Sequence, residues 1–179
     1  MTPREPTDVR IRPYTLDDVD ALYEAGRESI EHMHPWMPWC HPEYSREEAL
    51  DWVTENCRQF EAGEVYSFIV VDADGRFLGG CGLNNLNGQH HYANLGYWLR
   101  ASALGKGIAT QAVRLLRDYV LDNTEFDRLE IIVAVDNADS HRVAERVGAV
   151  REGVLREAIL LHDQRHDAVI YSLLRSDPR

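Results

Sequence analysis

A short glycine-rich segment, residues 104–109, marks the point where the sequence changes pattern, and it limits the folds that the chain can adopt. It reads Leu104-Gly105-Lys106-Gly107-Ile108-Ala109. Before it, apolar runs alternate with turn signals, as in the strands of an antiparallel sheet. After it come apolar residues at helical spacing and then the continuous apolar run 129–135, which is typical of a buried strand. Glycines between a strand and a helix leave backbone N–H groups free at the helix N-terminus, a geometry that suits an anion.

The remaining elements follow from caps, turns and periodicity. Thr15-x-x-Asp18 and Ser45-x-x-Glu48 resemble capping boxes and predict two helices in the first third of the chain. A further helix is expected from about Ser140 to Val147, ended by Gly148. Strands are predicted at 9–12, 66–71, 77–83, 94–99, 129–135, 154–161 and 166–174. The expected fold is α/β: a mixed, mostly antiparallel seven-stranded sheet flanked by helices, in a single domain over residues 1–179.

Composition excludes several classes of protein. Apolar residues make up 44% and charged residues 27% of the chain, as in ordinary globular domains, and no run approaches the ~18 apolar residues that a membrane-spanning helix needs. The net charge of −11 repels phosphate backbones and anionic lipid, so we expect neither free nucleic acid nor a membrane as partner. Met1 to Arg10 lack a secretory signal, and the three cysteines lack disulfide or zinc spacing. We therefore expect a cytoplasmic protein with reduced thiols, either a monomer or a homodimer.

Three kinds of phosphate-binding loop compete for the glycine segment. A P-loop needs Ser or Thr after Gly-Lys, where this chain has Gly107, so that interpretation fails. A dinucleotide fingerprint needs a third small residue where Thr110 stands and a tight turn directly after its strand, and no alternating βαβ units follow here. The third kind is an acyl-CoA loop, and the sequence around it carries a family resemblance.

Residues 104–109 resemble the Gln/Arg-x-x-Gly-x-Gly/Ala loop of the GNAT acyltransferase superfamily, with Gly107 and Ala109 on its two fixed small positions. The strand order and the Asn137-x-x-Ser140 start of the helix after the fifth strand are similar too. Three further motifs are similar to the branch that acetylates the N-terminal amines of ribosomal proteins, the RimJ/RimL type: Pro35-Trp36-Met37-Pro38-Trp39, Gly96-Tyr97-Trp98-Leu99, and His166-Asp167 in the closing hairpin. The resemblance spans nearly the whole chain.

The resemblance implies acetyl-CoA as co-substrate. In this family the acyl-CoA pyrophosphate lies on the loop that here comprises Leu104, Gly105, Lys106, Gly107, Ile108, Ala109 and Thr110. The pantetheine lies along the strand that here holds Tyr97, Trp98 and Leu99, where two strands splay apart; Gly96 suits a bulge at that point. Asn137 matches a family asparagine that hydrogen-bonds the CoA arm, and its alternative role is an Asx turn after the strand.

Acetyl transfer from a thioester to an amine needs a deprotonated amine and a proton for the leaving thiolate. Ser140 matches the serine that protonates this thiolate in the ribosomal branch, and its alternative role is a helix N-cap. The family's carboxylate base falls on Ile159 here, so that base is absent. The candidate bases are Glu157, expected on the same face of its strand as Ile159, and Glu31, acting through water. Cys81 is expected to be a buried thiol and not a nucleophile.

The segment 32–42 is rich in proline and tryptophan, which excludes a regular element but not an ordered loop. His34, Trp36 and Trp39 are the predicted substrate-binding residues. The tryptophans either flank an incoming chain terminus or fill the core beneath the loop. The histidines of this segment and Cys40 lack a recurrent zinc spacing, so we expect no metal.

The predicted function is acetyl-CoA-dependent N-acetylation of a primary amine, in the first place the N-terminal amine of a ribosomal protein or peptide. Two alternatives stay open. The acceptor is a small-molecule amine such as a polyamine, an amino-sugar or an antimetabolite, or the chain is a non-catalytic acyl-CoA-binding sensor. The second alternative is motivated by Leu104 and Ile159, which depart from the family pattern.

Overall fold

The computed structural model describes residues 8–178, so most of the N-terminal segment expected to lack a signal lies outside the described residues. Seven strands form one sheet in the order β1-β2-β3-β4-β5-β7-β6. Their bounds are β1 (Arg10–Pro13), β2 (Tyr66–Val71), β3 (Phe77–Asn87), β4 (Tyr92–Leu99), β5 (Arg128–Ala134), β6 (Val150–Leu161) and β7 (Gln164–Leu174). Only β4 and β5 pair in parallel. The mixed, mostly antiparallel sheet is confirmed.

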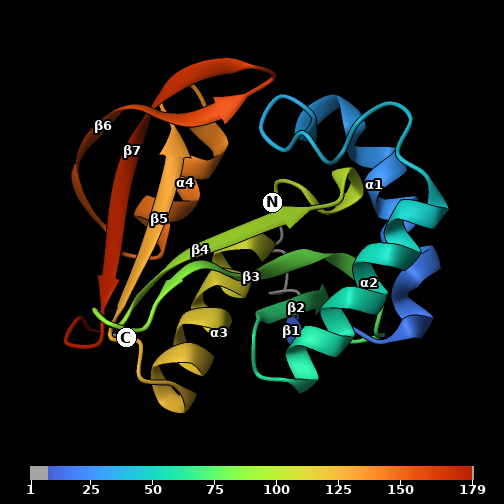
Figure 1. The fold of residues 1–179 in the computed structure, drawn as a ribbon, viewed down its shortest axis with the longest axis horizontal. Helices are drawn as coiled ribbons and strands as arrows, with labels where there is room; N and C mark the ends of the chain where they lie inside the picture. Colours follow the sequence, from blue (N-terminus) through green and yellow to red (C-terminus); the bar gives the residue numbers. More distant parts are fainter. Residues whose placement is uncertain (1–7, 179) are drawn as a thin grey trace, which may run out of the picture.

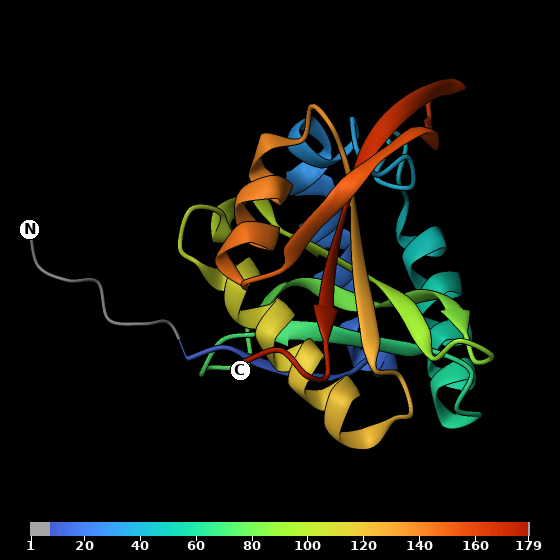
Figure 2. The same cartoon turned by 90° about the vertical axis from the view of Figure 1, so that its left-hand side faces the viewer.

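Helices cover both faces of this sheet (Figure 1). They are α1 (Val19–Met33), α2 (Arg46–Glu61), α3 (Ile108–Asn123) and α4 (Ala138–Arg146), with the short 3-10 turns η1 (Leu16–Asp18) and η2 (Ala101–Ala103). The side view in Figure 2 shows α3 and α4 on one side of the sheet. Among residues 8–178, none of the helices is long and apolar enough to cross a membrane.

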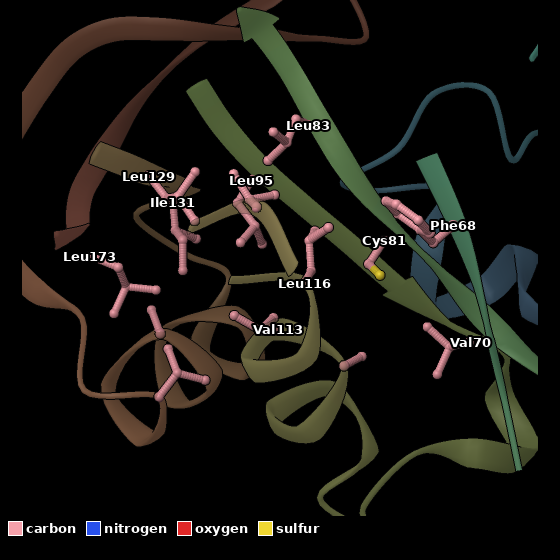
Figure 3. Packing of buried hydrophobic residues seen from close by; sticks show 14 of the residues in the cluster. Phe68, Val70, Cys81, Leu83, Leu95, Val113, Leu116, Leu129, Ile131 and Leu173 are labelled. Carbon is pink, nitrogen blue, oxygen red and sulfur yellow. The ribbon is translucent and has the colours of Figure 1, made fainter. Parts of the chain in front are cut away.

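Strand alternation sends side chains into two separate cores. Phe68 and Val70 of β2 pack with Leu116 of α3 in the larger core, which Figure 3 shows from close by. Ile69 and Val71 of the same strand point to the opposite face and pack against α1 and α2. Alternate residues of β2 therefore belong to different cores, one on each face of the sheet.

The helix starts agree with the expected caps at two positions and differ at a third. Ser45 and Glu48 form the predicted capping box of α2, and Thr15 and Asp18 form one before α1, although the first turn there is 3-10. The expectation for α4 was wrong in detail. Asn137 is its N-cap and accepts a hydrogen bond from Ser140 N at 3.1 Å, so Ser140 lies inside the first turn.

The strands β4 and β5 separate soon after they meet. Their pairing ends at Asn94 and Glu130. Beyond these residues β4 stays with β3 and β5 stays with β7, and the two strands diverge in Figure 1. Gly96 lies in regular register opposite Gly82, so the bulge expected at Gly96 is absent and the splay begins without it.

Candidate active site

A cavity of about 220 Å³ occupies the gap between the diverging strands, and we call it the gap cavity. Its residues come from β3, β4, β5, β6, the start of α4 and the α1–α2 loop. Its lining comprises Trp36, Met37, Asn84, Asn94, Leu95, Gly96, Tyr97, Ile131, Ile132, Val133, Ala134, Asn137, Ser140, Ile159 and Leu161. The structure thus brings together the predicted Trp36, Tyr97, Asn137 and Ser140, and it places Ile159 among them.

Tyr97 and Ser140 form a hydrogen-bonded pair in this cavity. Tyr97 Oη lies 2.8 Å from Ser140 Oγ and 3.2 Å from the Ser140 carbonyl oxygen. Burial raises the pKa of Tyr97 to about 12, although the bond to Ser140 opposes that rise. The phenol therefore stays protonated at neutral pH. The pair can supply a proton to a group in the gap.

The glycine segment leads directly into α3. Gly105 and Gly107 have φ values of 72° and 75°, and a Cβ at either position would meet open space, so the backbone conformation and not the packing requires glycine there. Gly107 is the N-cap of α3 and supplies no side-chain cap. The first N–H groups of a helix have no partner within it, so this end of α3 presents free donors. They can bind an anion such as a pyrophosphate.

The chain between β4 and the glycine segment is tied to α1. Glu28 accepts hydrogen bonds from Arg100 Nε at 2.9 Å, Ser102 N at 3.0 Å and Ser102 Oγ at 2.9 Å. Ser29 Oγ accepts another from Ala101 N at 3.0 Å. The bond from Arg100 is the main reason that the pKa of Glu28 falls to about 2. The Glu28 carboxylate therefore holds the backbone that leads from β4 to the glycine segment.

A second and larger cavity of about 530 Å³ lies on the sheet face covered by α1 and α2, and we call it the aromatic cavity. Its lining comprises Tyr14, Leu22, Met37, Trp39, Tyr44, Glu48, Trp52, Ser67, Gly80, Cys81, Gly82, Leu83, Asn84, Gly96, Tyr97 and Trp98. The predicted Trp39 lies here and packs edge-on against Trp98, with ring centroids 5.3 Å apart. Trp36 and Trp39 thus line different cavities.

Several predicted residues lie elsewhere. Glu31 and Glu157 are exposed and line neither cavity. The regular alternation that predicted Glu157 on the face of Ile159 is broken, because β6 has a register shift between Leu155 and Ile159 and Glu157 adopts a φ of 51°. His34 also lines neither cavity. Its ring packs against His162 at 4.4 Å, and His162 Nε2 donates to the His34 carbonyl oxygen at 2.8 Å.

The thiols of the chain are free, and Cys81 is buried in the sheet. Burial raises the pKa of the Cys81 thiol to about 12, which keeps it protonated and unreactive. Cys40, Cys57 and Cys81 are free thiols. Within the described part of the chain, no three His, Cys, Asp or Glu side chains are grouped so as to hold a metal ion.

Apart from Trp39, Tyr97 and Trp98, the walls of the aromatic cavity were not anticipated from the sequence. Trp52 of α2 is 46% exposed and lines the cavity beside Tyr14. The signal available in the sequence was Gly79-Gly80-Cys81-Gly82, because glycines in a strand leave no side chains on the sheet. Their faces and neighbours depend on strand register, which local sequence does not specify.

The geometry agrees with the comparison to known protein families. Residues 8–150 match the acetyltransferase (GNAT) domain. The chain belongs to the GNAT acetyltransferase family. It is therefore an N-acetyltransferase.

Individual GNAT proteins match nearly the whole chain. YdaF of Bacillus subtilis (strain 168) is 31% identical over 176 residues, which cover 94% of this chain and 92% of YdaF. The ribosomal-protein-serine acetyltransferase of Escherichia coli (strain K12) is 29% identical over 154 residues, 86% of each chain. RimL, a ribosomal L7/L12 alpha-N-protein acetyltransferase solved in complex with coenzyme A, superposes with a TM-score of 0.84 at 25% identity and 96% coverage of both chains. The RimJ/RimL resemblance is confirmed.

Proposed function

We propose that this GNAT enzyme transfers the acetyl group of acetyl-CoA to the N-terminal amine of a protein or peptide, in the gap between β4 and β5. The observation that carries the proposal is the Tyr97–Ser140 pair, with an Oη–Oγ distance of 2.8 Å inside the gap cavity. It combines a proton donor with an open space between two strand edges. The names of the E. coli relative and of RimL, both ribosomal-protein acetyltransferases, support a protein terminus as acceptor.

The two strand edges suit the pantetheine arm. Past Asn94, β4 pairs with β3 on one side only, and past Glu130 β5 pairs with β7 on one side only. Each edge therefore has peptide groups that can bond an amide-containing chain laid between them. The pyrophosphate would then reach Gly105 to Thr110 at the start of α3, and Asn137 at the other side of the gap would face the arm.

Ser140 and Tyr97 would handle the proton of the leaving group. As the amine attacks, the C–N bond forms, the C–S bond breaks, the nitrogen releases a proton to water and the sulfur takes one, so water afterwards restores the proton that the donor pair has given up. A serine hydroxyl is a weak acid on its own, and Tyr97 within 2.8 Å can donate to Ser140 Oγ as that oxygen gives up its proton. In this scheme Ser140 is the catalytic donor and Tyr97 replenishes it.

The acceptor amine would be held by an asparagine pair and not by a carboxylate. Asn94 Nδ2 donates to Asn84 Oδ1 at 2.8 Å, and Asn94 Oδ1 is buried without a hydrogen-bond partner in the described structure. Both residues line the gap cavity, whereas none of the described Asp or Glu residues does. An unpaired buried acceptor favours an N–H donor in its place. The amine would thus arrive deprotonated or lose its proton to water.

The test is thiol release from acetyl-CoA with a panel of acceptors. Peptides that differ in their first residue, with a blocked peptide and spermidine as comparisons, should separate the functions. Free peptide termini should be acetylated and the blocked peptide should not. Spermidine as the only acceptor would favour the small-molecule alternative, and an absence of release with every amine, despite acetyl-CoA binding, would favour the sensor.

A pair of glycine variants tests the donor site in the same assay. Gly107→Val should abolish turnover. It should also abolish the stabilisation of the fold by acetyl-CoA, which is ~2.7 kcal/mol at a hundred times the dissociation constant and is seen as a rise in melting temperature. Gly63→Val is the matched control, because Gly63 has a φ of 72° in open space, like the 75° of Gly107. Both should lose ~1 to 3 kcal/mol of stability through backbone strain. Equal acetyl-CoA shifts in the two variants would contradict the loop assignment.

A further inference from the structure

The aromatic cavity is continuous with the gap cavity. Met37, Asn84, Gly96 and Tyr97 line both. If the reacting amine lies beside Asn84 and Asn94 as proposed above, the group attached to the amine carbon lies at this junction. The aromatic cavity is then the space that receives this group, so the residues that line the cavity indicate which acceptors fit.

The register of three strands explains why the cavity is open. Ser67 of β2 pairs with Gly82 of β3, and Gly82 pairs with Gly96 of β4. These neighbouring positions put almost no side-chain volume on the face below α1 and α2. The hollow extends from β2 to the edge where β4 and β5 part.

Aromatic side chains line the rest of this hollow. Trp39 packs edge-on against both Trp98 and Tyr44, with centroid distances of 5.3 and 5.4 Å, and Trp52 packs edge-on against Tyr14 at 4.7 Å. Edge-to-face pairs of this kind hold rings in defined positions. The walls are therefore preformed, and they present apolar surface to whatever enters.

The charge of the cavity argues against a polycation as occupant. Glu48 is the only charged residue that lines it among the described residues. Its carboxylate already accepts hydrogen bonds from Ser45 N at 2.9 Å, Ser45 Oγ at 2.8 Å and His41 Nε2 at 2.9 Å. These bonds cap α2, so the carboxylate is engaged. The cavity therefore suits an uncharged apolar group.

We infer that the acceptor begins with a large apolar residue, such as Phe, Leu or Met, whose side chain enters the aromatic cavity and contacts its rings while its α-amine reaches the gap. This inference rests on the proposed function. A serine or alanine side chain would place much less apolar surface against the residues that line this cavity. Selectivity then comes from apolar surface removed from water at the first residue.

The experiment compares peptides that are identical except for a first residue of Phe, Leu, Met, Ser or Ala. We expect kcat/KM to be about tenfold or more higher for the three large apolar residues than for Ser and Ala. Equal values, or a preference for Ser or Ala, would overturn the inference while leaving N-terminal acetylation in place. Failure of every peptide beside rapid turnover of spermidine would overturn the proposed function and the inference with it.

Variants of the cavity make the test specific. Ser67→Ile fills the hollow from β2 and should bring the Phe-to-Ser ratio of kcat/KM close to one, whereas Ser176→Ile, on the exposed C-terminal turn, should leave that ratio unchanged. The acetyl-CoA melting shift reports that each variant is folded. If Ser67→Ile does not fold, Trp39→Ala removes a wall and should lower the same ratio. An undiminished ratio in a folded variant of either kind would overturn the inference.

Discussion

At the scale of single residues, the Tyr97–Ser140 pair, which we propose as the proton donor, joins two positions 43 residues apart. Tyr97 comes from β4 and Ser140 from the first turn of α4. Asn137 caps that helix, so Ser140 Oγ is not needed as a cap and can form a hydrogen bond with Tyr97. The serine hydroxyl is therefore available for the role that we propose.

Ser140→Ala should lower kcat by a factor of ~10² to 10⁴ with little change in KM for acetyl-CoA, because a proton donor to the thiolate acts in the transition state. Tyr97→Phe should lower kcat in the same direction, and the double variant should lose less than the product of the two effects, since the residues act as a unit. Steady-state kinetics of the three proteins measures this.

Asn137→Ala is the control for a structural effect. It should lower the unfolding free energy by ~1 kcal/mol through the lost N-cap, whereas Ser140→Ala should not. A Ser140→Ala protein with normal kcat but reduced stability would show that the serine is only structural.

At the scale of elements, α1 stabilises the path from β4 to the glycine segment through Glu28. The carboxylate binds Arg100 and the Ser102 backbone and hydroxyl. The Arg100 side chain is 11% exposed and the Glu28 side chain 31%, so the pair is only partly shielded from solvent. The helix between β1 and β2 thus orders a loop that follows β4, more than 70 residues later.

Glu28→Gln should reduce stability by ~1 to 2 kcal/mol at neutral pH, toward the lower end of the ~1.5 to 3 kcal/mol range for hydrogen bonds to a charged group, because the Glu28 side chain is 31% exposed. The folded-state pKa of Glu28 is about 2 against an ordinary value of 4.5. Its stabilisation is therefore fully present above pH 4.5 and is lost as the pH falls toward 2. Thermal unfolding of the wild type and of Glu28→Gln across this range should show a difference in melting temperature that disappears as the pH approaches 2.

Glu55→Gln provides the comparison, because Glu55 pairs with Arg58 on the exposed surface of α2. Its loss should change the melting temperature little at any pH. A gap between wild type and Glu28→Gln that stays constant down to pH 2 would contradict the role given to the Glu28 charge.

At the scale of the whole molecule, the net charge of −11 should influence which termini are acetylated fastest. A negative protein attracts a basic chain, and salt screens this attraction with a Debye length of ~10 Å at 0.1 M. At saturating acetyl-CoA, kcat/KM for a peptide with a basic tail should fall as salt is added. A peptide with the same first residue and a neutral tail should respond little, and equal responses would contradict the electrostatic effect.

The sequence by itself determined most of the elements and the family. The strand 66–71 and a helix directly after the glycine segment are as predicted, because alternation and helical periodicity are local properties of the chain. The same holds for the capping box at Ser45. The glycines at 105 and 107 were informative because both have positive φ, which is a requirement of the backbone itself.

Tertiary structure decided which side chains line the two cavities. Glu157 does not follow the alternation expected from Ile159, because a bulge interrupts β6, and Glu157 N donates a hydrogen bond to Asp167 Oδ1 of the neighbouring strand at 2.8 Å. The aromatic cavity exists because register aligns Ser67, Gly82 and Gly96 across three strands. Register and bulges depend on pairing between distant segments, so they become visible only when the sheet is assembled.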